Sequence, residues 1–238
     1  MKEIFDKYVS NYNLENEKIR SRYKHCLRVM ELSRKYSKLL GFSDYDVELA
    51  TLIGLIHDIG RFEQIKIYDS FDDSKTVDHA HFGVKILFEE GMIKSFWKNE
   101  EDYELIRFAI ENHNKFKIPN IDDERIMKHA KLIRDMDKLD IVYLLGYLKD
   151  FNTKATNDDI SEEFVNGIKN HHSLLYKYRK NPNDDIVIKF GYVFDIYNDI
   201  CLIEMKDNLN HYYEQIGNKE KFEKIYLEVM KYIDERTC

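Results

Sequence analysis

Residues 50–61 read ATLIGLIHDIGR, an apolar helical segment whose ionisable side chains, His57, Asp58 and Arg61, all come at its end. An adjacent histidine and aspartate in this position are costly to bury unless partners satisfy both. A divalent metal ion does so, because neutral imidazole nitrogen and ionised carboxylate oxygen are both metal ligands. A hydrogen-bonded pair at a helix end is the commoner arrangement, so the dipeptide alone does not decide between the two.

Helical patterns lie on both sides of this segment and continue through the chain. Only 2 prolines and 9 glycines interrupt 238 residues, which favours long helices joined by short turns. No convincing alternating strand pattern is present, so we predict an all-α fold. The expected helices cover residues 16–40, 43–60, 78–90, 99–113, 122–148, 160–180, 185–208 and 218–235, with a polar loop at 64–77 beside a cleft.

The best candidate for a boundary is the polar stretch NTKATNDD, Asn152 to Asp159. We expect residues 1–150 to form a helical core that carries the site. Residues 151–238 are expected to form a C-terminal helical extension that packs on this core as one structural unit.

Four further ionisable residues accompany the His-Asp pair along the chain, in the order His25, His57-Asp58, His79, His113 and Asp137. The phrases LIHDIGRF around the pair and RDMDKLD around Asp137 stand in the same order. Over about residues 20–150 this arrangement resembles the HD superfamily of metal-dependent phosphohydrolases. Each piece is ordinary alone, and the ordered set is specific.

The resemblance implies an HD-domain helical bundle with additional C-terminal helices, and a dinuclear metal site. In that site His25, His57, Asp58 and Asp137 hold the first ion, and Asp58 bridges to a second ion held by His79 and His113. A metal-bound hydroxide then hydrolyses a phosphomonoester or phosphodiester of a small, nucleotide-like substrate. A mixed histidine and carboxylate set suits Mn, Fe, Co, Ni or Zn better than Mg.

Two cations are expected to take part in catalysis together with Asp58. Arg61 lies four residues after His57, on the same helical face, and arginine grips phosphate with two hydrogen bonds. Lys138 follows Asp137 directly, but a helical neighbour points about 100° away, so a surface lysine is almost as good an interpretation.

Lys115, just after His113, is a weaker candidate for phosphate binding. Asp140 shares a helical face with Asp137 and is expected to orient a ligand histidine, whereas Asp135 is expected to face solvent.

The remaining histidines are expected to lie outside the site. His81 is interpreted as a surface or rim residue and His129 as a helix-face residue, and His171, His172 and His211 are expected to be exposed. Cys26, Cys201 and Cys238 show no paired spacing, so we expect free thiols in a reducing compartment, with Cys26 in the core.

The net charge of −7, from 37 basic and 44 acidic residues, argues against binding of duplex nucleic acid. It leaves a small phosphorylated substrate possible, since local charge in a pocket can oppose the global sign. With no apolar leader and no long apolar run, the expected location is cytoplasmic, away from membranes. The aromatic-rich C-terminal helices make a homodimer a reasonable expectation.

Two other functions stay open at this point. The first is a di-iron oxygenase of the same fold. Loaded with two irons, the same six-ligand arrangement resembles the one that such an oxygenase uses, and oxygen uptake by an iron-loaded sample would distinguish it from a hydrolase. The second is a non-catalytic binding module stabilised by its metal, which predicts no turnover. The Gly-Tyr-Pro signature of the cyclic-dinucleotide branch is missing, since Pro119 follows Ile118 and Pro182 follows Asn181.

Overall fold

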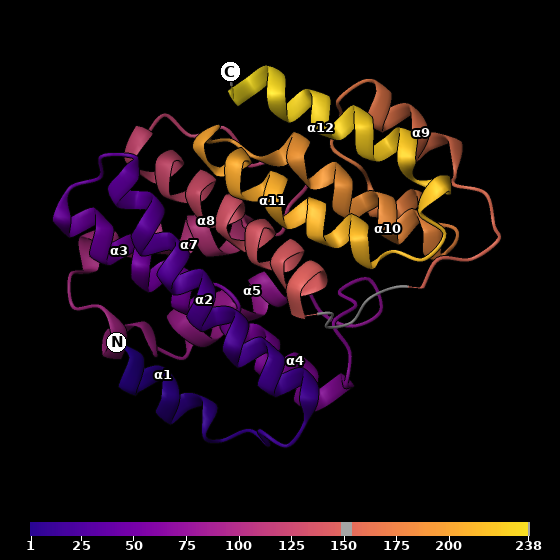
Figure 1. Cartoon of the computed structure of the whole chain (residues 1–238). Coiled ribbons are helices and arrows are strands. Elements are labelled where there is room, and N and C mark those ends of the chain that lie inside the picture. The colour runs from indigo at the N-terminus through magenta and orange to yellow at the C-terminus, as the bar shows by residue number, and fades with distance from the viewer. Residues whose placement is uncertain (149–153, 238) are drawn as a thin grey trace. The chain divides into compact units, whose positions relative to one another are not determined.

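The computed structural model describes residues 1–148 and 154–237, and every regular element among them is a helix (Figure 1). The predicted all-α class is therefore confirmed. The chain divides into two compact units, Met1–Asp137 and Lys138–Cys238, and the division lies inside one helix, α8 (Glu124–Tyr143). The predicted boundary at residue 150, with residues 152 and 153 of the polar stretch, lies outside the described residues and stays a prediction.

The N-terminal unit consists of helices in close sequence succession, most of them short, with α2 and α8 the longest (Figure 1). They are α1 (Lys2–Val9), α2 (Glu17–Leu39), α3 (Asp44–Ile56), α4 (Ile59–Tyr68), α5 (His79–Val84), η1 (Lys85–Glu89), α6 (Ile93–Phe96), η2 (Glu100–Asp102), α7 (Tyr103–Asn112) and most of α8.

Helix α2 begins and ends where the sequence predicts. The Asn16 side chain accepts hydrogen bonds from the backbone N–H groups of Lys18 (2.9 Å) and Ile19 (3.3 Å), as an N-cap does. At the other end Gly41 has a φ of 73°, a left-handed conformation that glycine adopts without the strain a Cβ would cause. Ser43 caps α3 in turn, with its hydroxyl 3.1 Å from the Asp46 N–H.

The core of this unit forms around α3, which is buried along its whole second half and packs along α2. Gly54 is what lets the two helices approach. A Cβ on Gly54 would lie 2.8 Å from the backbone oxygen of Val29, so any larger residue would force α2 away. Cys26 faces this core and is fully buried, as predicted.

Two predicted segments of the N-terminal unit differ from the structure. The helix expected over 43–60 is two helices, α3 and α4, separated by His57 and Asp58. Helix α4 then continues to Tyr68, so the irregular loop is shorter than predicted and begins at Asp69, whose φ is 47°. In this last part of α4 Gln64 and Ile65 are buried, whereas residues 66–68 are exposed.

The C-terminal unit is also built of helices, which begin after α8 and run almost to the end of the chain. They are η3 (Leu144–Leu148), α9 (Glu162–Lys169), η4 (Tyr176–Tyr178), α10 (Pro182–Gly191), η5 (Tyr192–Asp195), α11 (Ile200–Gln215), η6 (Lys219–Lys221) and α12 (Glu223–Thr237). Within this unit α12 packs on α9, α10 and α11.

The C-terminal helices are shorter than the sequence predicts. The helix expected over 160–180 stops at Lys169, because the chain turns at His171, where φ is 53°. The helix expected over 185–208 is interrupted between Asp195 and Ile200. The predicted turn at Asn181–Asp184 is instead the start of α10, with a capping box between Asn181 and Asp184.

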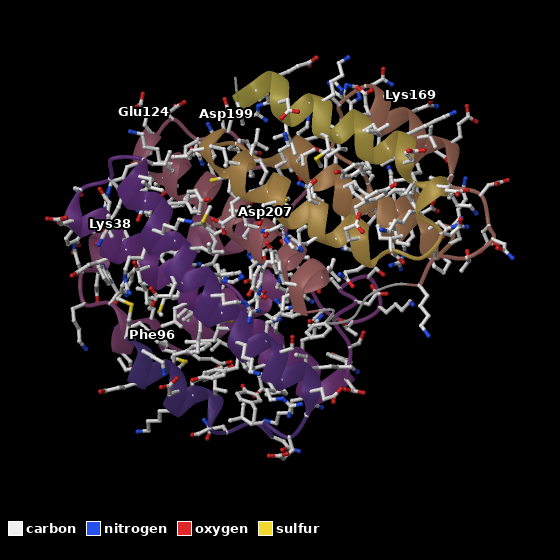
Figure 2. All side chains as sticks on the ribbon, viewed as in Figure 1. Lys38, Phe96, Glu124, Lys169, Asp199 and Asp207 are labelled. Carbon is white, nitrogen blue, oxygen red and sulfur yellow. The ribbon has the colours of Figure 1, made fainter. Side chains whose placement is uncertain are left out.

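Charged side chains cover the outside of both units, as Lys38 on α2 and Lys169 on α9 illustrate (Figure 2). Among the described residues, no helix combines the length and the apolar character that crossing a bilayer requires. The described cysteines, Cys26 and Cys201, are buried and form no disulfide bond, and Cys238 lies outside the described residues.

Candidate metal centre

The His-Asp pair fills the junction between two helices. His57 follows the last residue of α3, and Asp58 precedes the first residue of α4. Because the chain changes direction here, both side chains leave the apolar helix toward the same buried space. His57 is 0% exposed and Asp58 is 2% exposed.

The other four predicted ligands reach this space from separate elements of the N-terminal unit. His25 comes from α2, His79 is the first residue of α5, His113 follows the end of α7, and Asp137 lies on α8. The structure thus brings together all six predicted side chains from a span of more than 100 residues.

The first group of donors contains two imidazoles and two carboxylates. The Nε2 atoms of His25 and His57 lie 3.3 Å apart. Asp137 Oδ1 is 3.2 Å from His25 Nε2 and 3.7 Å from His57 Nε2. Asp58 Oδ2 is 3.6 Å from each of the same two nitrogens.

The second group uses the other oxygen of Asp58. Asp58 Oδ1 lies 3.2 Å from His79 Nε2 and 3.6 Å from His113 Nε2, and these two nitrogens are 3.0 Å apart. Asp58 therefore presents one oxygen to each pair of histidines, as a bridging carboxylate between two ions would.

The hydrogen bonds of the imidazoles indicate which ring nitrogen faces this space. Nδ1 of His57 lies 2.9 Å from the Gly54 carbonyl, and Nδ1 of His113 lies 2.6 Å from the Ile110 carbonyl, so both Nδ1 atoms carry the proton. Nε2 of each ring is then a lone pair. These lone pairs face other histidine nitrogens and carboxylates, an arrangement that is repulsive until a positive ion lies among them.

Asp58 Oδ1 supports the same conclusion, because it is buried and accepts no hydrogen bond. A buried carboxylate oxygen without a hydrogen bond is expensive, and coordination to a metal ion removes this cost. The donor set, imidazole nitrogen with carboxylate oxygen, fits divalent transition metal ions.

Protonation states are those that metal binding requires. Burial alone would raise the pKa of Asp58, but the charge of Arg22 and the neighbouring imidazoles hold it well below its ordinary value. Burial also opposes ionisation of Asp137, yet the neighbouring imidazoles of His25 and His57 keep its pKa well below the usual range. Burial lowers the pKa of His113 to about 4, so its imidazole is neutral near neutral pH.

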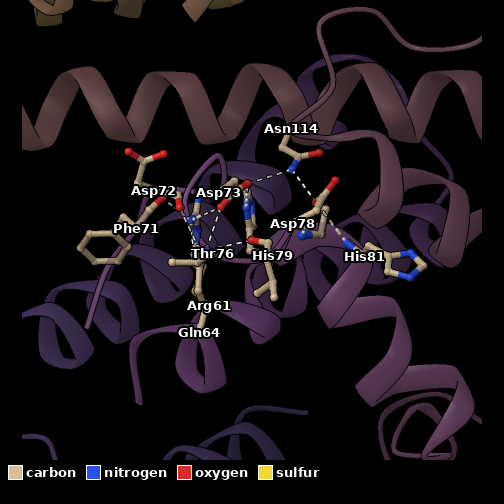
Figure 3. Close-up of polar contacts among 12 residues, drawn as sticks. Arg61, Gln64, Phe71, Asp72, Asp73, Thr76, Asp78, His79, His81 and Asn114 are labelled. Atoms are coloured by element: carbon tan, nitrogen blue, oxygen red, sulfur yellow. Dashed lines mark hydrogen bonds and ion pairs between the residues drawn. The ribbon is translucent and has the colours of Figure 1, made fainter. Parts of the chain in front are cut away.

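A second layer of polar contacts holds His79 in place (Figure 3). Asp73 Oδ2 lies 2.5 Å from His79 Nδ1, and Asp73 Oδ1 accepts from Arg61 Nη1 (2.7 Å) and Gln64 Nε2 (2.9 Å). This carboxylate fixes the ring so that Nε2 points at Asp58, a role typical of carboxylates behind metal-binding histidines. Sequence reasoning missed Asp73, since it lies in the polar loop with no periodicity to mark it.

Arg61 makes its hydrogen bonds through one nitrogen only. Besides Asp73, Nη1 donates to Gln64 Oε1 and to the Phe71 carbonyl, both at 2.7 Å. Nε lies 3.8 Å from Asp58 Oδ1. It is buried and makes no hydrogen bond. The guanidinium therefore anchors the loop through Nη1, while its Nε lies near Asp58 of the metal centre.

Arg22 is a functional candidate that the sequence reasoning did not identify. Its Nη1 donates to Asp58 Oδ2, and its guanidinium lies 5.0 Å from the centre of the Phe71 ring. Its side chain is 16% exposed. The signal was present in the sequence, because a residue three positions before His25 lies on the same face of a helix.

Arg134 is another residue that the sequence reasoning did not identify, and it positions His113 through hydrogen bonds to the backbone around it. It is 1% exposed, and its guanidinium donates to the backbone carbonyls of Asn112 (3.1 Å), His113 (3.2 Å) and Phe116 (3.4 Å), and to that of Lys115. A helix end leaves such carbonyls without partners, so one buried arginine on α8 caps the end of α7.

Close backbone packing sets the position of His79 as well. A Cβ on Gly60 would lie 2.2 Å from the His79 carbonyl oxygen and 2.5 Å from the Gly83 nitrogen. The backbones of helices α4 and α5 are therefore in direct contact at Gly60. This contact brings His79 to within reach of Asp58.

The remaining predicted helpers lie as follows. Lys138 is 8% exposed and its Nζ lies 3.7 Å from Asp195 Oδ2, while Lys115 is paired with Asp78. A catalytic role for Lys138 stays a prediction. Asp140 is buried, and its predicted contact with a ligand histidine is also still a prediction.

Asp135 was expected at the surface, and that is wrong, because it is 0% exposed. Arg134, Asp135 and Met136 are consecutive and all buried, so this part of α8 has no solvent-facing side.

The other histidines lie mostly as predicted. His81, His172 and His211 are exposed. His129 is a buried helix residue whose ring nitrogens lie near the backbone oxygens of Arg125 and Asp46. The expectation for His171 is wrong, because its Nε2 lies 2.9 Å from Glu228 and the side chain is only one-third exposed.

Comparison with known proteins agrees with this geometry. The family model of the HD domain matches residues 22–142, more than half of the chain, and this range contains all six predicted ligands. No significant match was found among curated proteins or among solved structures.

Proposed function

This chain belongs to the HD domain family, which consists largely of metal-dependent hydrolases, and we propose that it hydrolyses a phosphomonoester or phosphodiester bond. The substrate we propose is small, phosphorylated and nucleotide-like. Two divalent transition metal ions would be bound, one by His25, His57, Asp58 and Asp137 and one by Asp58, His79 and His113. When bound, such ions would lower the pKa of a bound water and would place positive charge at the phosphoryl group.

The observation that carries the proposal is the position of Asp58 between two pairs of histidines. One oxygen faces His25 and His57 and the other faces His79 and His113, all within 3.6 Å. Two groups of three donor residues, each including Asp58, have ligand atoms close enough to share one ion apiece. A single structural ion would need no second pair of histidines around the same carboxylate.

Two arginines support a phosphate ester as the substrate. Arg22 and Arg61 approach opposite oxygens of Asp58, and the centre of the Phe71 ring lies 5.0 Å and 5.8 Å from their guanidinium carbons. Arginine presents several N–H donors in a plane and binds phosphate oxygens in pairs. We assign two roles to Arg61. Its Nε and Nη2 hold the substrate phosphate, and its Nη1 holds the loop whose Asp73 orients His79.

The experiment that tests the proposal measures metal content and hydrolysis of a generic aryl phosphate ester on the same samples. Wild-type protein is compared with Asp58→Ala, and Asp44→Ala, at the exposed start of α3, serves as the matched control. We expect about two ions per chain in the wild type and in the control, and loss of both ions with hydrolysis in Asp58→Ala.

Other results would change the conclusion in specific ways. Metal bound without any ester hydrolysis, together with oxygen uptake by the iron-loaded protein, would replace the hydrolase with the oxygenase. Metal without turnover of either kind would leave a metal-stabilised binding module. Hydrolysis that survives in Asp58→Ala would contradict the proposed centre.

A further inference from the structure

The C-terminal unit contains a lysine whose positive charge is held between two tyrosines. Lys189 on α10 lies with its Nζ 3.0 Å from the Tyr176 hydroxyl and 2.9 Å from the Tyr192 hydroxyl. The two hydroxyls lie 2.5 Å from each other. Tyr176 belongs to η4 and Tyr192 to η5, so three separate elements build this group, which we call the Lys189 cradle.

The three side chains of the cradle have more hydrogen-bond donors than the cradle has acceptors for them. An ammonium has three N–H donors, and each phenol has one O–H donor. Two N–H groups of Lys189 donate to the phenol oxygens, and one phenol donates to the other. One N–H and one O–H are left over, and the described residues offer no further hydrogen bond to any of the three side chains.

The charge of the cradle also has no counterion among the residues that the structure describes. No carboxylate among residues 1–148 and 154–237 forms an ion pair with Lys189. A second cation of this unit, Lys138, lies with Nζ 5.9 Å from the Tyr192 ring centre and is itself paired with Asp195. Burial opposes the charge, yet the tyrosine oxygens keep the pKa of Lys189 well above its ordinary value, so the ammonium is charged at neutral pH.

From these observations we propose that the Lys189 cradle is a binding site for the phosphate group of a small molecule. A phosphate oxygen can accept both leftover donors, and its negative charge matches the lysine. Tyr176 is 49% exposed, which leaves the cradle open to a ligand from solvent. The site is made only of residues of the C-terminal unit.

The test uses the full chain treated with a chelator, so that phosphate cannot bind through metal ions. Inorganic phosphate is titrated while backbone amide signals of residues 176–192 are followed by NMR. We expect saturable shifts in that range, and at least about tenfold weaker binding in Lys189→Gln, which loses a charge-assisted hydrogen bond. Lys206→Gln, an exposed lysine paired with Asp234, is the matched control and should bind as the wild type does.

A second variant guards against misfolding, since Lys189 is partly buried. Tyr176→Phe changes only a hydroxyl on a half-exposed ring and should weaken binding by a few-fold with an unchanged thermal melt. A parallel titration with a nucleoside monophosphate identifies the source of the phosphate. Shifts with both ligands indicate an organic phosphate, and shifts with inorganic phosphate alone indicate the free ion.

The proposal is overturned if the wild type shows no saturable shift, or if Lys189→Gln binds as tightly as the wild type. Because the chelated protein is used, either result leaves the proposed hydrolysis untouched. Conversely, a protein without metal-dependent turnover can still bind phosphate in the cradle, so the two proposals fail separately.

Discussion

The two compact units leave opposite kinds of polar group without partners. In the N-terminal unit, imidazole lone pairs and carboxylate oxygens converge, and Asp58 Oδ1 accepts no hydrogen bond. In the C-terminal unit, Lys189 and its two tyrosines have donors in excess. The kind of group left over is the basis for proposing a cation as the ligand of the first unit and an anion as the ligand of the second.

Two buried aspartates show the same difference within one residue type. Asp184 in the C-terminal unit accepts from the Ser161 N–H (2.8 Å), the Ser161 hydroxyl (2.7 Å) and the Lys180 N–H (2.8 Å). Its needs are met by the chain, so it has a structural role. Asp58 is equally buried, but one of its oxygens accepts no hydrogen bond, as a metal-binding role would require.

The largest effect is expected from His79→Ala. We expect bound metal to fall from about two ions to about one and ester hydrolysis to fall by roughly 10³-fold, or about 4 kcal/mol of transition-state stabilisation. Elemental analysis and aryl phosphate turnover measure both quantities. His81→Ala is the matched control, since it lies two residues away on α5 with 68% of its side chain exposed against 3% for His79. Equal loss in both variants would contradict the assignment.

Asp73→Asn should have the next largest effect. An amide can still touch His79 Nδ1 but does not carry the charge that orients and polarises the ring, so metal affinity should fall by about 10- to 100-fold. Competition with a fluorescent chelator gives the affinity. Asp72→Asn, one residue earlier and bonded to Ser74 instead, should bind metal normally, and a matching loss there would show that the loop as a whole is responsible.

Gly60→Ala tests whether backbone contact between α4 and α5 positions His79. Because the new methyl would overlap backbone atoms of His79 and Gly83, we expect about 1–3 kcal/mol less free energy of unfolding by urea. The effect on metal affinity should follow. In Gly83→Ala the nearest atoms lie 3.4 Å from the added Cβ, so this control should unfold near the wild-type midpoint.

The smallest effect concerns Asp184 and pH. Burial would raise its pKa, but the hydrogen bonds from Ser161 and Lys180 leave it below the ordinary value. A depressed pKa adds stability above the unfolded-state pKa and loses it as pH falls through the folded-state value. We expect Asp184→Asn to unfold about 1–2 kcal/mol more easily at pH 7, and the gap should narrow below about pH 4. A gap independent of pH would show that the carboxylate charge is not involved.

The all-α class and the six residues that converge in the centre could be predicted from the sequence, because both depend on local signals. Caps such as Asn16 and Ser43 mark where helices begin, and the ordered histidines and aspartates have recognisable neighbours. The helix break at His57 and Asp58 was missed because Ile59 continues the apolar pattern without a proline or a polar turn.

The residues that the sequence did not reveal act through contacts between distant segments. Asp73 is one of several acids in a polar loop, and nothing local separates it from Asp72. Arg134 resembles any charged helix residue until the end of α7 lies against it. Likewise, the Lys189 cradle joins residues from three elements, and no spacing along the chain marks the group.

Helix α8 belongs to both compact units, since it runs from Glu124 to Tyr143 and the division lies between Asp137 and Lys138. A helical amide donates to the carbonyl four residues before it, so the amides that follow Asp137 stay hydrogen-bonded only while the preceding turn of α8 is helical. A gene cut at this point would yield two fragments with frayed ends. Hydrogen exchange of the amides at 138–143 would therefore report how readily this part of α8 opens.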